Sequence, residues 1–561
     1  MECWSPKLPC LFPCKVTSFC RDTCLFEWKI VSGHFFLETF SKRLLIYDYA
    51  VWLFLCRDLC ADVVKRNSSL EKETFERKWM VYIKNQRLSP MKKKFCNFAV
   101  IMNNDNKKAT LELGTKPVGS LLLQYALPAI IAMTAASLYN IIDRIFIGQV
   151  VGAEAISGLA ITFPFMNLGA AFGAAVGVGS ATAISVKLGQ KDYLTAENLL
   201  GNTVTLNLII GIGFSVICLL FLEPILRFFG ASDTTLPYAR DFMQVILAGN
   251  VFSHMYFGMN AVLRAASKPR QAMMATIFTV MMNILLDVVF ILWWHWGIRG
   301  AGLATVISQA LALCYQMRLL SNKHELLHLK RGIYRLKATL VKNILAIGVS
   351  PFLMNVCTCV VVIFVNNQLV RYGGDMAVGG FGISNSVATV FVMFVLGLNQ
   401  GMQPIAGYNY GAQNIERLLR VLQLAIISAT CIMVVGWTVA MFFPRVIAHL
   451  FTTDERLTAM AVTAIRFNLL VYPIVGFQMV TGNFFQCIGK VRISIFLSLS
   501  RQLLILVPLL AVLPQWLGLE GVWCALPASD ATASLIALAI LVTYMRKFKA
   551  QARESQQTST E

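Results

Sequence analysis

Two polar residues, Asn283 and Asp287, interrupt an otherwise almost wholly apolar stretch that runs from Thr276 to Trp294. They are four residues apart, so on a helix they lie one turn apart on the same face. A carboxylate at the centre of a bilayer helix costs about 2.5–3.5 kcal/mol on insertion scales, so it is expected to face a protein interior or a wet cavity. We interpret the pair as part of a functional site. A structural aspartate satisfied by neighbouring helices is the alternative.

The composition is typical of a helical membrane protein with many spans. Of the 561 residues 57% are hydrophobic and 14% are charged, whereas soluble domains carry about 25% charged residues. The net charge of +20 is spread in short clusters between apolar runs, which is the pattern of cytoplasmic loops. Because these clusters do not form one basic patch with interleaved aromatics, we exclude nucleic acid as a partner.

The first part of the chain, residues 1–101, does not resemble the rest. It contains 8 of the 15 cysteines, in no metal-binding or disulfide pattern, and its one apolar run, residues 44–56, is too short to span a bilayer. Our hypothesis is that Met102 is the natural start and that residues 1–101 are an over-extended upstream translation. A genuine, poorly ordered cytoplasmic extension is the alternative.

From about residue 119 apolar runs recur regularly, and we predict an all-α membrane protein with twelve transmembrane helices. The predicted domains are an N-lobe over 102–320 with helices 1–6, a cytoplasmic linker over 321–341, a C-lobe over 342–546 with helices 7–12, and a cytoplasmic tail over 547–561. The predicted spans are 119–148, 155–181, 197–222, 237–263, 271–296, 300–320, 342–371, 378–403, 418–443, 459–486, 493–514 and 520–545.

The distribution of basic residues predicts the topology. Alternate loops, the 321–342 segment and the tail are rich in lysine and arginine, whereas the other loops hold few. The positive-inside rule therefore places both termini and the linker in the cytoplasm. We expect a multi-pass protein of the cell (inner or plasma) membrane.

The two halves repeat each other at an offset of about 222 residues. GAEAISGLAI at Gly152 aligns with GDMAVGGFGI at Gly374, and LRAASKPR at Leu263 aligns with FQCIGKVR at Phe485. Six spans per half place the pseudo-symmetry axis along the membrane normal, giving two six-helix bundles. Repeats around a site at the midplane are typical of alternating-access transporters. A duplicated channel or scaffold is the alternative.

Further polar residues in the N-terminal half extend the first pair. Asp143 in the first span, Asn260 in the fourth and Thr305 in the sixth could join Asn283 and Asp287 in an oxygen-rich pocket. Oxygen ligands of this kind suit a hard cation, or a proton shared between carboxylates. The alternative for Asp143 is a water-exposed aspartate without a functional role that forms an ion pair with Arg144.

The C-terminal half lacks a matching set. The repeat position of Asp143 holds Asn366, and that of Asp287 holds Leu509. Asp530 is the one deep acidic candidate in this half, and its role is open. We therefore expect ion chemistry concentrated in the N-terminal half.

These motifs as a set resemble the multidrug and toxic compound extrusion (MATE) family of efflux transporters over nearly all of residues 110–545. The residues that carry the resemblance are LPAIIAMTAASLYNIIDRIFIG, the GxxxISGLAI start of the second span, LRAASKPR, and NILLDVVFI followed by GIRGAGLAT. The resemblance is strongest to bacterial members whose key carboxylates lie in the N-lobe. It implies a V-shaped pair of six-helix bundles that alternate between outward- and inward-facing states.

The resemblance also implies a function, namely secondary active export of organic, often cationic compounds by antiport with H⁺ or Na⁺. It places Asp143, Asn283, Asp287 and Thr305 in the cation or proton pocket, with Asn260 beside them, and a bound Na⁺ would lie at Asp143, Asn283 and Asp287. We expect no cofactor, no enzymatic activity and a monomer in the lipid bilayer. Adaptable side chains suit varied small organic substrates, and the candidates for drug contact are Met166, Met282, Phe391 and Met402.

Two other functions are weighed against this one. A lipid-linked oligosaccharide flippase of the same superfamily would need a basic central cavity, whereas the charges within the spans here are mainly acidic. A membrane-embedded enzyme would need a nucleophile–base pair or metal ligands at membrane depth, and the sequence has neither HExxH nor GxSxG. It also has no Walker motif, so ATP hydrolysis is not expected.

Overall fold

A computed structural model describes residues 112–150, 153–323 and 325–557, and in these ranges the chain forms helices and turns. The prediction for residues 1–101 lies outside the described residues. Apolar side chains dominate every long helix, since in a bilayer a helix satisfies its own backbone hydrogen bonds. The N-lobe consists of α5 (Val118–Val150), α6 (Ala153–Gly189), α7 (Tyr193–Leu220), α8 (Leu222–Phe228), α9 (Leu236–Ala265), α10 (Pro269–Asp287), the π-helix η1 (Val288–Trp293) and α11 (Gly297–Leu320).

The C-lobe begins with one continuous helical element that contains two spans. This element, α12, turns at Gly374, whose φ of 65° and ψ of −168° break the helix and suit a residue without a Cβ. The rest of the lobe consists of α13 (Ile415–Phe442), α14 (Pro444–His449), α15 (Glu455–Asn468), α16 (Tyr472–Cys487), α17 (Val491–Leu499), the π-helix η2 (Ser500–Leu506), α18 (Val507–Leu517) and α19 (Leu519–Gln557), and α12 itself spans Ala338–Gly411.

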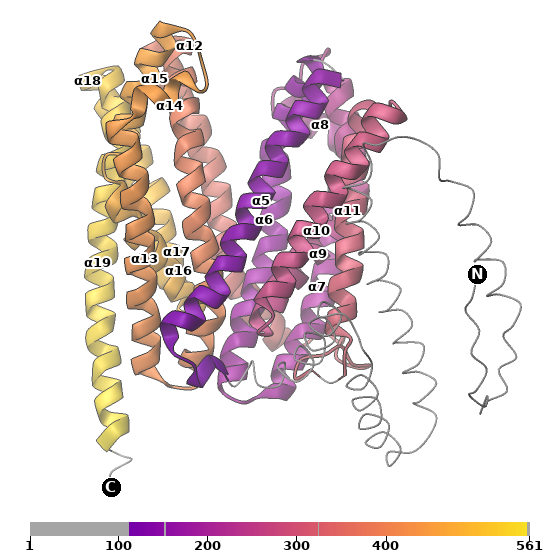
Figure 1. Cartoon of the computed structure of the whole chain (residues 1–561), viewed down its shortest axis with the longest axis vertical. Coiled ribbons are helices and arrows are strands. Elements are labelled where there is room, and N and C mark those ends of the chain that lie inside the picture. The colour runs from indigo at the N-terminus through magenta and orange to yellow at the C-terminus, as the bar shows by residue number, and fades with distance from the viewer. Residues whose placement is uncertain (1–111, 151–152, 324, 558–561) are drawn as a thin grey trace, which may run out of the picture. The chain divides into compact units, whose positions relative to one another are not determined.

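The helices account for the twelve predicted spans. In the described part of the chain nine helices are long and apolar enough to cross a membrane, and α15 with α16 forms a tenth span bent by 53°. Counting α12 twice and adding α9, whose thirty residues include several charged and polar side chains, gives twelve. The prediction of an all-α membrane protein is therefore confirmed, and Figure 1 shows the helices of the two lobes.

The internal repeat is visible in the turns that join the helices. Asp192 caps α7 by accepting from the Thr195 amide over 3.1 Å, and Asn414 caps α13 by accepting from the Arg417 amide over 3.2 Å; these caps are 222 residues apart. Residues with positive φ recur at the same offset or one residue less. They are Lys191 and Gln413, Ser267 and Gly489, and Gly297 and Gly518. The two lobes are thus pseudo-symmetric in backbone detail, as the sequence repeat predicts.

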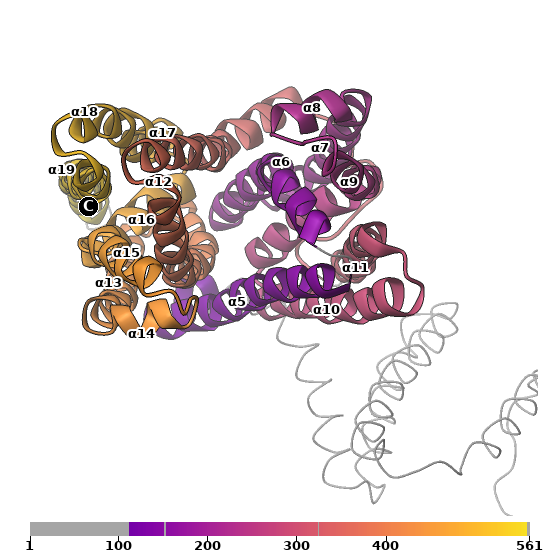
Figure 2. The ribbon, with the colours of Figure 1, turned by 90° about the horizontal axis from the view of Figure 1, so that it is seen from above.

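The lobes pack against each other mainly through α6 and α12, with α5 crossing to the C-lobe (Figure 2). The two helices approach each other closely at several glycines, which include Gly179 and Gly348. A Cβ on Gly179 would lie 2.1 Å from the Ile344 carbonyl oxygen, and one on Gly348 would lie 2.2 Å from the Ala175 carbonyl oxygen. A side chain at either position would therefore push the two helices apart.

The buried apolar residues form one shared core and two separate ones. The shared core joins Leu188 at the end of α6 and Leu327 in the linker to Ile405 of α12. A second core, which includes Phe165, lies within the N-lobe, and a third, which includes Trp523, lies within the C-lobe. In the N-lobe the shared core lies at the end that carries the linker, whereas in the C-lobe it continues as far as Ala448 in α14.

The linker between the lobes is bound to the N-lobe by polar contacts. Lys330 pairs with Glu197 of α7 at 2.7 Å. Asn202, one and a half turns further along α7, donates to the Arg335 carbonyl over 3.2 Å and accepts from the Lys337 amide over 2.8 Å. The predicted linker is thus an ordered segment that follows the surface of the N-lobe.

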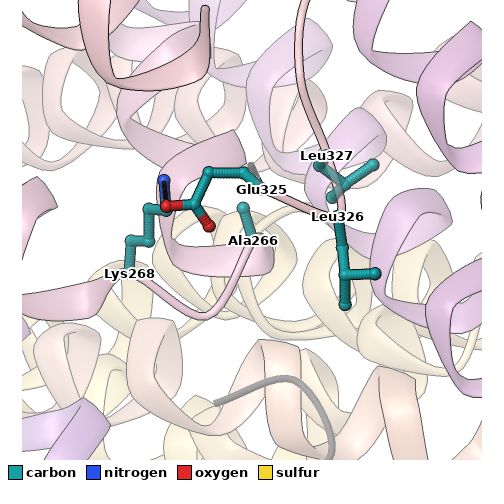
Figure 3. A pocket seen from close by; sticks show the side chains of 5 residues that line it. All are labelled: Ala266, Lys268, Glu325, Leu326 and Leu327. Carbon is teal, nitrogen blue, oxygen red and sulfur yellow. Dashed lines mark ion pairs between the residues drawn. The ribbon is translucent and has the colours of Figure 1, made fainter. Parts of the chain in front are cut away.

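A buried ion pair fixes the start of the same linker. Lys268, in the turn between α9 and α10, lies 3.1 Å from Glu325, and their side chains are 4% and 7% exposed. Figure 3 shows the ammonium and the carboxylate pointing toward each other beside Ala266 and Leu327. The linker is therefore attached both to the turn between α9 and α10 and to helix α7 before α12 begins.

Candidate functional site

The side chain of Asn283 lies between Asp287 and Thr305, so the pair predicted on one helix face reaches a second helix. With its amide nitrogen toward the carboxylate, Asn283 donates to Asp287 Oδ2 over 2.9 Å, and its oxygen accepts from the Thr305 hydroxyl over 3.2 Å and from the Thr305 amide over 3.1 Å. Asn283 is 1% exposed, Asp287 0% and Thr305 8%. This arrangement joins α10 to α11 at the level of the carboxylate.

Tyr139 brings α5 into the same site. Its hydroxyl lies 3.2 Å from the Thr305 hydroxyl, so Thr305 contacts both α5 and α10. Asp143, one turn further along α5, is buried and close enough to Asp287 for the two carboxylates to interact electrostatically. The structure therefore brings together four of the five residues predicted from the sequence, namely Asp143, Asn283, Asp287 and Thr305.

Tyr139 is a site residue that the sequence pattern does not single out. It precedes Asp143 by four residues in SLYNIIDR, which is the spacing that places two side chains on one helix face. A tyrosine is common near the ends of membrane helices, so its presence there carries little information by itself. The i, i+4 relationship to a carboxylate within an apolar run is the signal that identifies it.

The fifth predicted residue, Asn260, has other partners. Its amide donates to the Ala272 carbonyl over 3.1 Å and to the Thr276 hydroxyl over 3.2 Å, and Arg264 donates to its oxygen. Thr276 precedes Asn283 by seven residues on α10, which corresponds to roughly 10 Å along the helix. Asn260 thus joins α9 to the beginning of α10, away from the two carboxylates.

The helix that carries Asp287 changes form directly after it. The α-helical hydrogen bonding of α10 ends at Asp287, and the π-helix η1 follows; its wider repeat is seen where the Trp294 amide bonds to the Val289 carbonyl over 2.9 Å. π-Helical turns are rare and often occur at functional sites, because they reorient the neighbouring side chains.

The surroundings of Asp287 favour a cation or a proton as its partner. Its Oδ1 is buried and has no hydrogen-bond partner among the residues that the structure describes, and within the same residues no basic side chain forms an ion pair with it. An ionised carboxylate buried without a counter-charge is strongly disfavoured. The charge of Asp143 increases this cost, so the binding of a proton or a cation at Asp287 is favoured.

The four candidates for substrate contact lie in different surroundings. Met166 packs against the N-lobe core and Met282 is half-buried on α10. Phe391 packs against the shared core, and Met402 is 0% exposed within it.

In the described ranges no group of three or more histidine, cysteine or acidic side chains could hold a metal ion.

Comparison with protein families identifies the family to which this fold belongs. The MatE family model matches residues 128–289 and 346–512, one segment in each lobe. This chain belongs to the MATE family. Members of this family are transport proteins rather than enzymes, in agreement with the prediction from the sequence.

Curated relatives of this MATE protein are multidrug export proteins. The chain is 28% identical to the multidrug export protein MepA of Staphylococcus haemolyticus over 420 residues, which cover 75% of this chain and 92% of the relative. It is 25% identical to MepA of Staphylococcus aureus over 425 residues, which cover 76% of this chain and 94% of that protein.

Solved structures of MATE transporters share the fold. A multidrug resistance MATE family transporter of the MOP superfamily, in an outward-facing conformation, superposes with a TM-score of 0.74, at 24% identity, over 78% of this chain and 98% of that chain. A MATE structure in a bent conformation gives 0.75, at 24% identity, over 80% of this chain and 99% of that chain. These matches support the assignment of two six-helix lobes.

Proposed function

We propose that this MATE protein exports small organic compounds, many of them cationic, in exchange for H⁺ or Na⁺. The observation that carries the proposal is the buried pair of interacting carboxylates, Asp143 and Asp287. An exchangeable cation satisfies such a site, and its entry or release changes the charge between α5, α10 and α11. The names of the curated relatives support multidrug compounds as the exported substrates.

The proposed orientation follows from the charge of the loops. The linker and the tail are basic, so we place them, and both termini, on the cytoplasmic side of the cell membrane. The N-lobe residues of the core shared by the lobes lie at the linker end, and the separate N-lobe core lies toward the other end. In this orientation the lobes are closed toward the cytoplasm, which corresponds to an outward-facing state of a monomeric transporter.

The proposed coupling acts through α5. This helix contributes Tyr139 and Asp143 to the site and also packs against α12 of the other lobe. When a cation neutralises Asp143 and Asp287, the electrostatic repulsion between α5 and α10, which pack against each other, is removed, and α5 can repack. A ligand shifts a conformational equilibrium only by its differential affinity for the two states, so the cation and the exported compound must favour different states. Met166, Met282, Phe391 and Met402 remain proposed contacts for the compound.

Efflux of a fluorescent cationic dye from cells that express the full chain tests the proposal. Wild type, Asp287→Asn and the control Asp233→Asn are compared under an imposed proton or sodium gradient; the side chain of Asp233 is 88% exposed. We expect wild type and the control to expel dye, the more effective gradient to identify the ion, and Asp287→Asn to lose coupled efflux at equal expression. If Asp287→Asn pumps like wild type, the carboxylate is structural and the proposed coupling is wrong.

A further inference from the structure

We propose that the C-lobe contains a second cation site that is permanently filled by the protein itself, with the guanidinium of Arg501 in the place of an exchangeable ion. The proposal concerns a carboxylate that the coupling mechanism above does not use, Asp530 in α19. The Arg501–Asp530 ion pair does not depend on the proposed function. What it implies for the number of ions exchanged per transport cycle rests on that function.

The geometry is that of a buried carboxylate with a bound cation. Arg501 Nε lies 2.7 Å from Asp530 Oδ1, and the side chains are 33% and 8% exposed. An arginine is not deprotonated in proteins. The charge of Asp530 is therefore balanced at every pH at which the transporter works, without an ion from solution.

The pair joins the same two spans of the C-lobe that the coupling site joins in the N-lobe, but at other positions, since at the offset of 222 residues Asp287 corresponds to Leu509 and Asp530 to Ser308. In the N-lobe Asp287 ends α10 and accepts from Asn283, which in turn contacts Thr305 in α11. In the C-lobe, where the eleventh and twelfth spans repeat the fifth and sixth, Arg501 in η2 faces Asp530 in α19. Both the fifth and the eleventh spans contain a π-helix, although η1 begins directly after Asp287 and η2 contains Arg501 and lies earlier in its span. The same two spans are thus joined by polar side chains in each lobe, but these side chains differ in charge.

A tyrosine accompanies the charged groups in each lobe. Tyr139 experiences the charges of Asp143 and Asp287, and Tyr472 experiences those of Arg501 and Asp530. The Tyr472 hydroxyl donates to the Ala388 carbonyl over 3.0 Å, which joins the bend between α15 and α16 to α12. The C-lobe pair is therefore set into the packing of three spans rather than lying on the surface of α19.

The charge balance of the two sites explains how one lobe alone can carry the coupling. In the N-lobe the Oδ1 atom of Asp287 is buried without a hydrogen-bond partner among the residues that the structure describes, whereas the charges of Arg501 and Asp530 sum to zero. Only the N-lobe site then gains from binding a proton or a sodium ion. We infer that Arg501 prevents the C-lobe from becoming a second coupling site and so sets the number of ions exchanged per cycle.

Arginine truncation with chemical rescue tests this inference. Arg501→Ala, Asp530→Asn, the double variant and the control Arg445→Ala are prepared in the full chain; Arg445 is exposed at the start of α14. We expect Arg501→Ala to lose about tenfold or more in dye efflux, because Asp530 is left buried and unpaired. Free guanidinium is expected to raise dye efflux by Arg501→Ala several-fold. The double variant is expected to expel dye within about threefold of the wild-type rate and not to respond to guanidinium.

Ion binding to purified protein gives a readout that a merely structural role would not change. In thermal unfolding, guanidinium and Na⁺ are expected to raise the midpoint of Arg501→Ala more than that of wild type, the control or the double variant. The proposal is overturned if guanidinium neither stabilises Arg501→Ala nor restores its efflux, and if the double variant expels dye no faster than Arg501→Ala. Arg501 would then not act as the bound cation of Asp530. Failure of the N-lobe proposal is distinguishable, because it shows as coupled efflux by Asp287→Asn while these binding results stand.

Discussion

Lys268 and Glu325 form an ion pair of 3.1 Å whose two side chains are almost completely buried (Figure 3). The pair joins the turn between α9 and α10 to the linker, so it attaches the connection between the lobes to the N-lobe. Burial of two charges is costly, and their attraction compensates for this only while both partners are present.

Removal of one partner is therefore expected to be far more damaging than removal of both. Glu325→Gln leaves the Lys268 ammonium buried without a counter-charge and should destabilise the protein by roughly 3–5 kcal/mol. The double variant Lys268→Met with Glu325→Leu should be close to wild type, since it contains no buried charge. Chemical unfolding in detergent measures both, and an equal loss in the single and double variants would contradict this explanation.

The pH dependence of stability should reveal the same pair. Desolvation by burial lowers the pKa of Lys268, and Glu325 opposes this effect. The unfolded chain, with a lysine pKa near 10.4, therefore binds more protons than the folded one in the alkaline range below that value. The free energy of unfolding should therefore rise with pH between the folded-state pKa of Lys268 and the unfolded value. This gain in stability is absent below the folded-state pKa. Lys268→Met should lack this component of the slope, whereas the exposed-site variant Lys191→Met should retain it.

Asn202 is expected to determine whether the linker stays attached to α7. Its side chain bonds to the backbone of Arg335 and Lys337, so Asn202→Leu leaves these groups to water and frees the segment. Limited trypsin digestion should cleave Asn202→Leu at Arg331 or Arg335 several-fold faster than wild type. The matched control is Asn198→Ala, one turn earlier, whose amide bonds within its own helix; equal cleavage of the two variants would argue against an attached linker.

The acidic site was partly predictable because helical spacing can be read from a single chain. Asn283 and Asp287 are neighbours on one face of one helix, and polar residues in apolar runs identify Asp143 and Thr305 as candidates. Asn260 has the same sequence signal, yet it bonds to Ala272 and Thr276. Asn260 differs from the other residues in its position along the membrane normal relative to α10. This relative position depends on how the helices pack, which the sequence of a single chain does not reveal.

The course of the linker could not be predicted for a similar reason. Residues 321–341 have no helical periodicity, and their charges are equally typical of a loop in water. Their partners, Glu197 and Asn202, lie more than a hundred residues earlier, at the start of the third predicted span. A polar residue at the end of a span is ordinary, so nothing in the chain indicates that these two hold a distant segment.

The glycine contact between the lobes predicts a shift between transport states. A side chain at Gly179 collides with the Ile344 carbonyl, so Gly179→Leu should disfavour the observed state by roughly 1–3 kcal/mol of overpacking. Cysteines at Gln190 and Ala412, in a background without other cysteines, should then cross-link less with a short bifunctional reagent. Gly213→Leu, where nothing lies within 4 Å of the new Cβ, is the control. Unchanged cross-linking in Gly179→Leu would show that this contact does not hold the lobes together.

The hydroxyl groups of Tyr139 and Thr305 should act as one unit in ion coupling. They lie 3.2 Å apart and connect α5 to the Asn283 amide. Tyr139→Phe removes one hydrogen bond of about 0.5–1.5 kcal/mol, which corresponds to roughly a two- to tenfold weaker apparent affinity for the coupling ion. Thr305→Val also removes the hydrogen bond to Asn283 and should weaken the affinity at least as much. Because the two share one bond, the double variant should lose less than the product of the single losses.

Ion titrations of dye efflux measure this coupling. Thr305→Ser, which keeps the hydroxyl, should remain within about twofold of wild type, and Tyr193→Phe, at a tyrosine that is 39% exposed, should be unaffected. If the losses multiply, or if they appear in the maximal efflux rate with no change in ion affinity, α5 is not linked to the carboxylates through these hydroxyls. The coupling would then have to pass through Asp143 alone, since it is the other residue of α5 that the structure places beside Asp287.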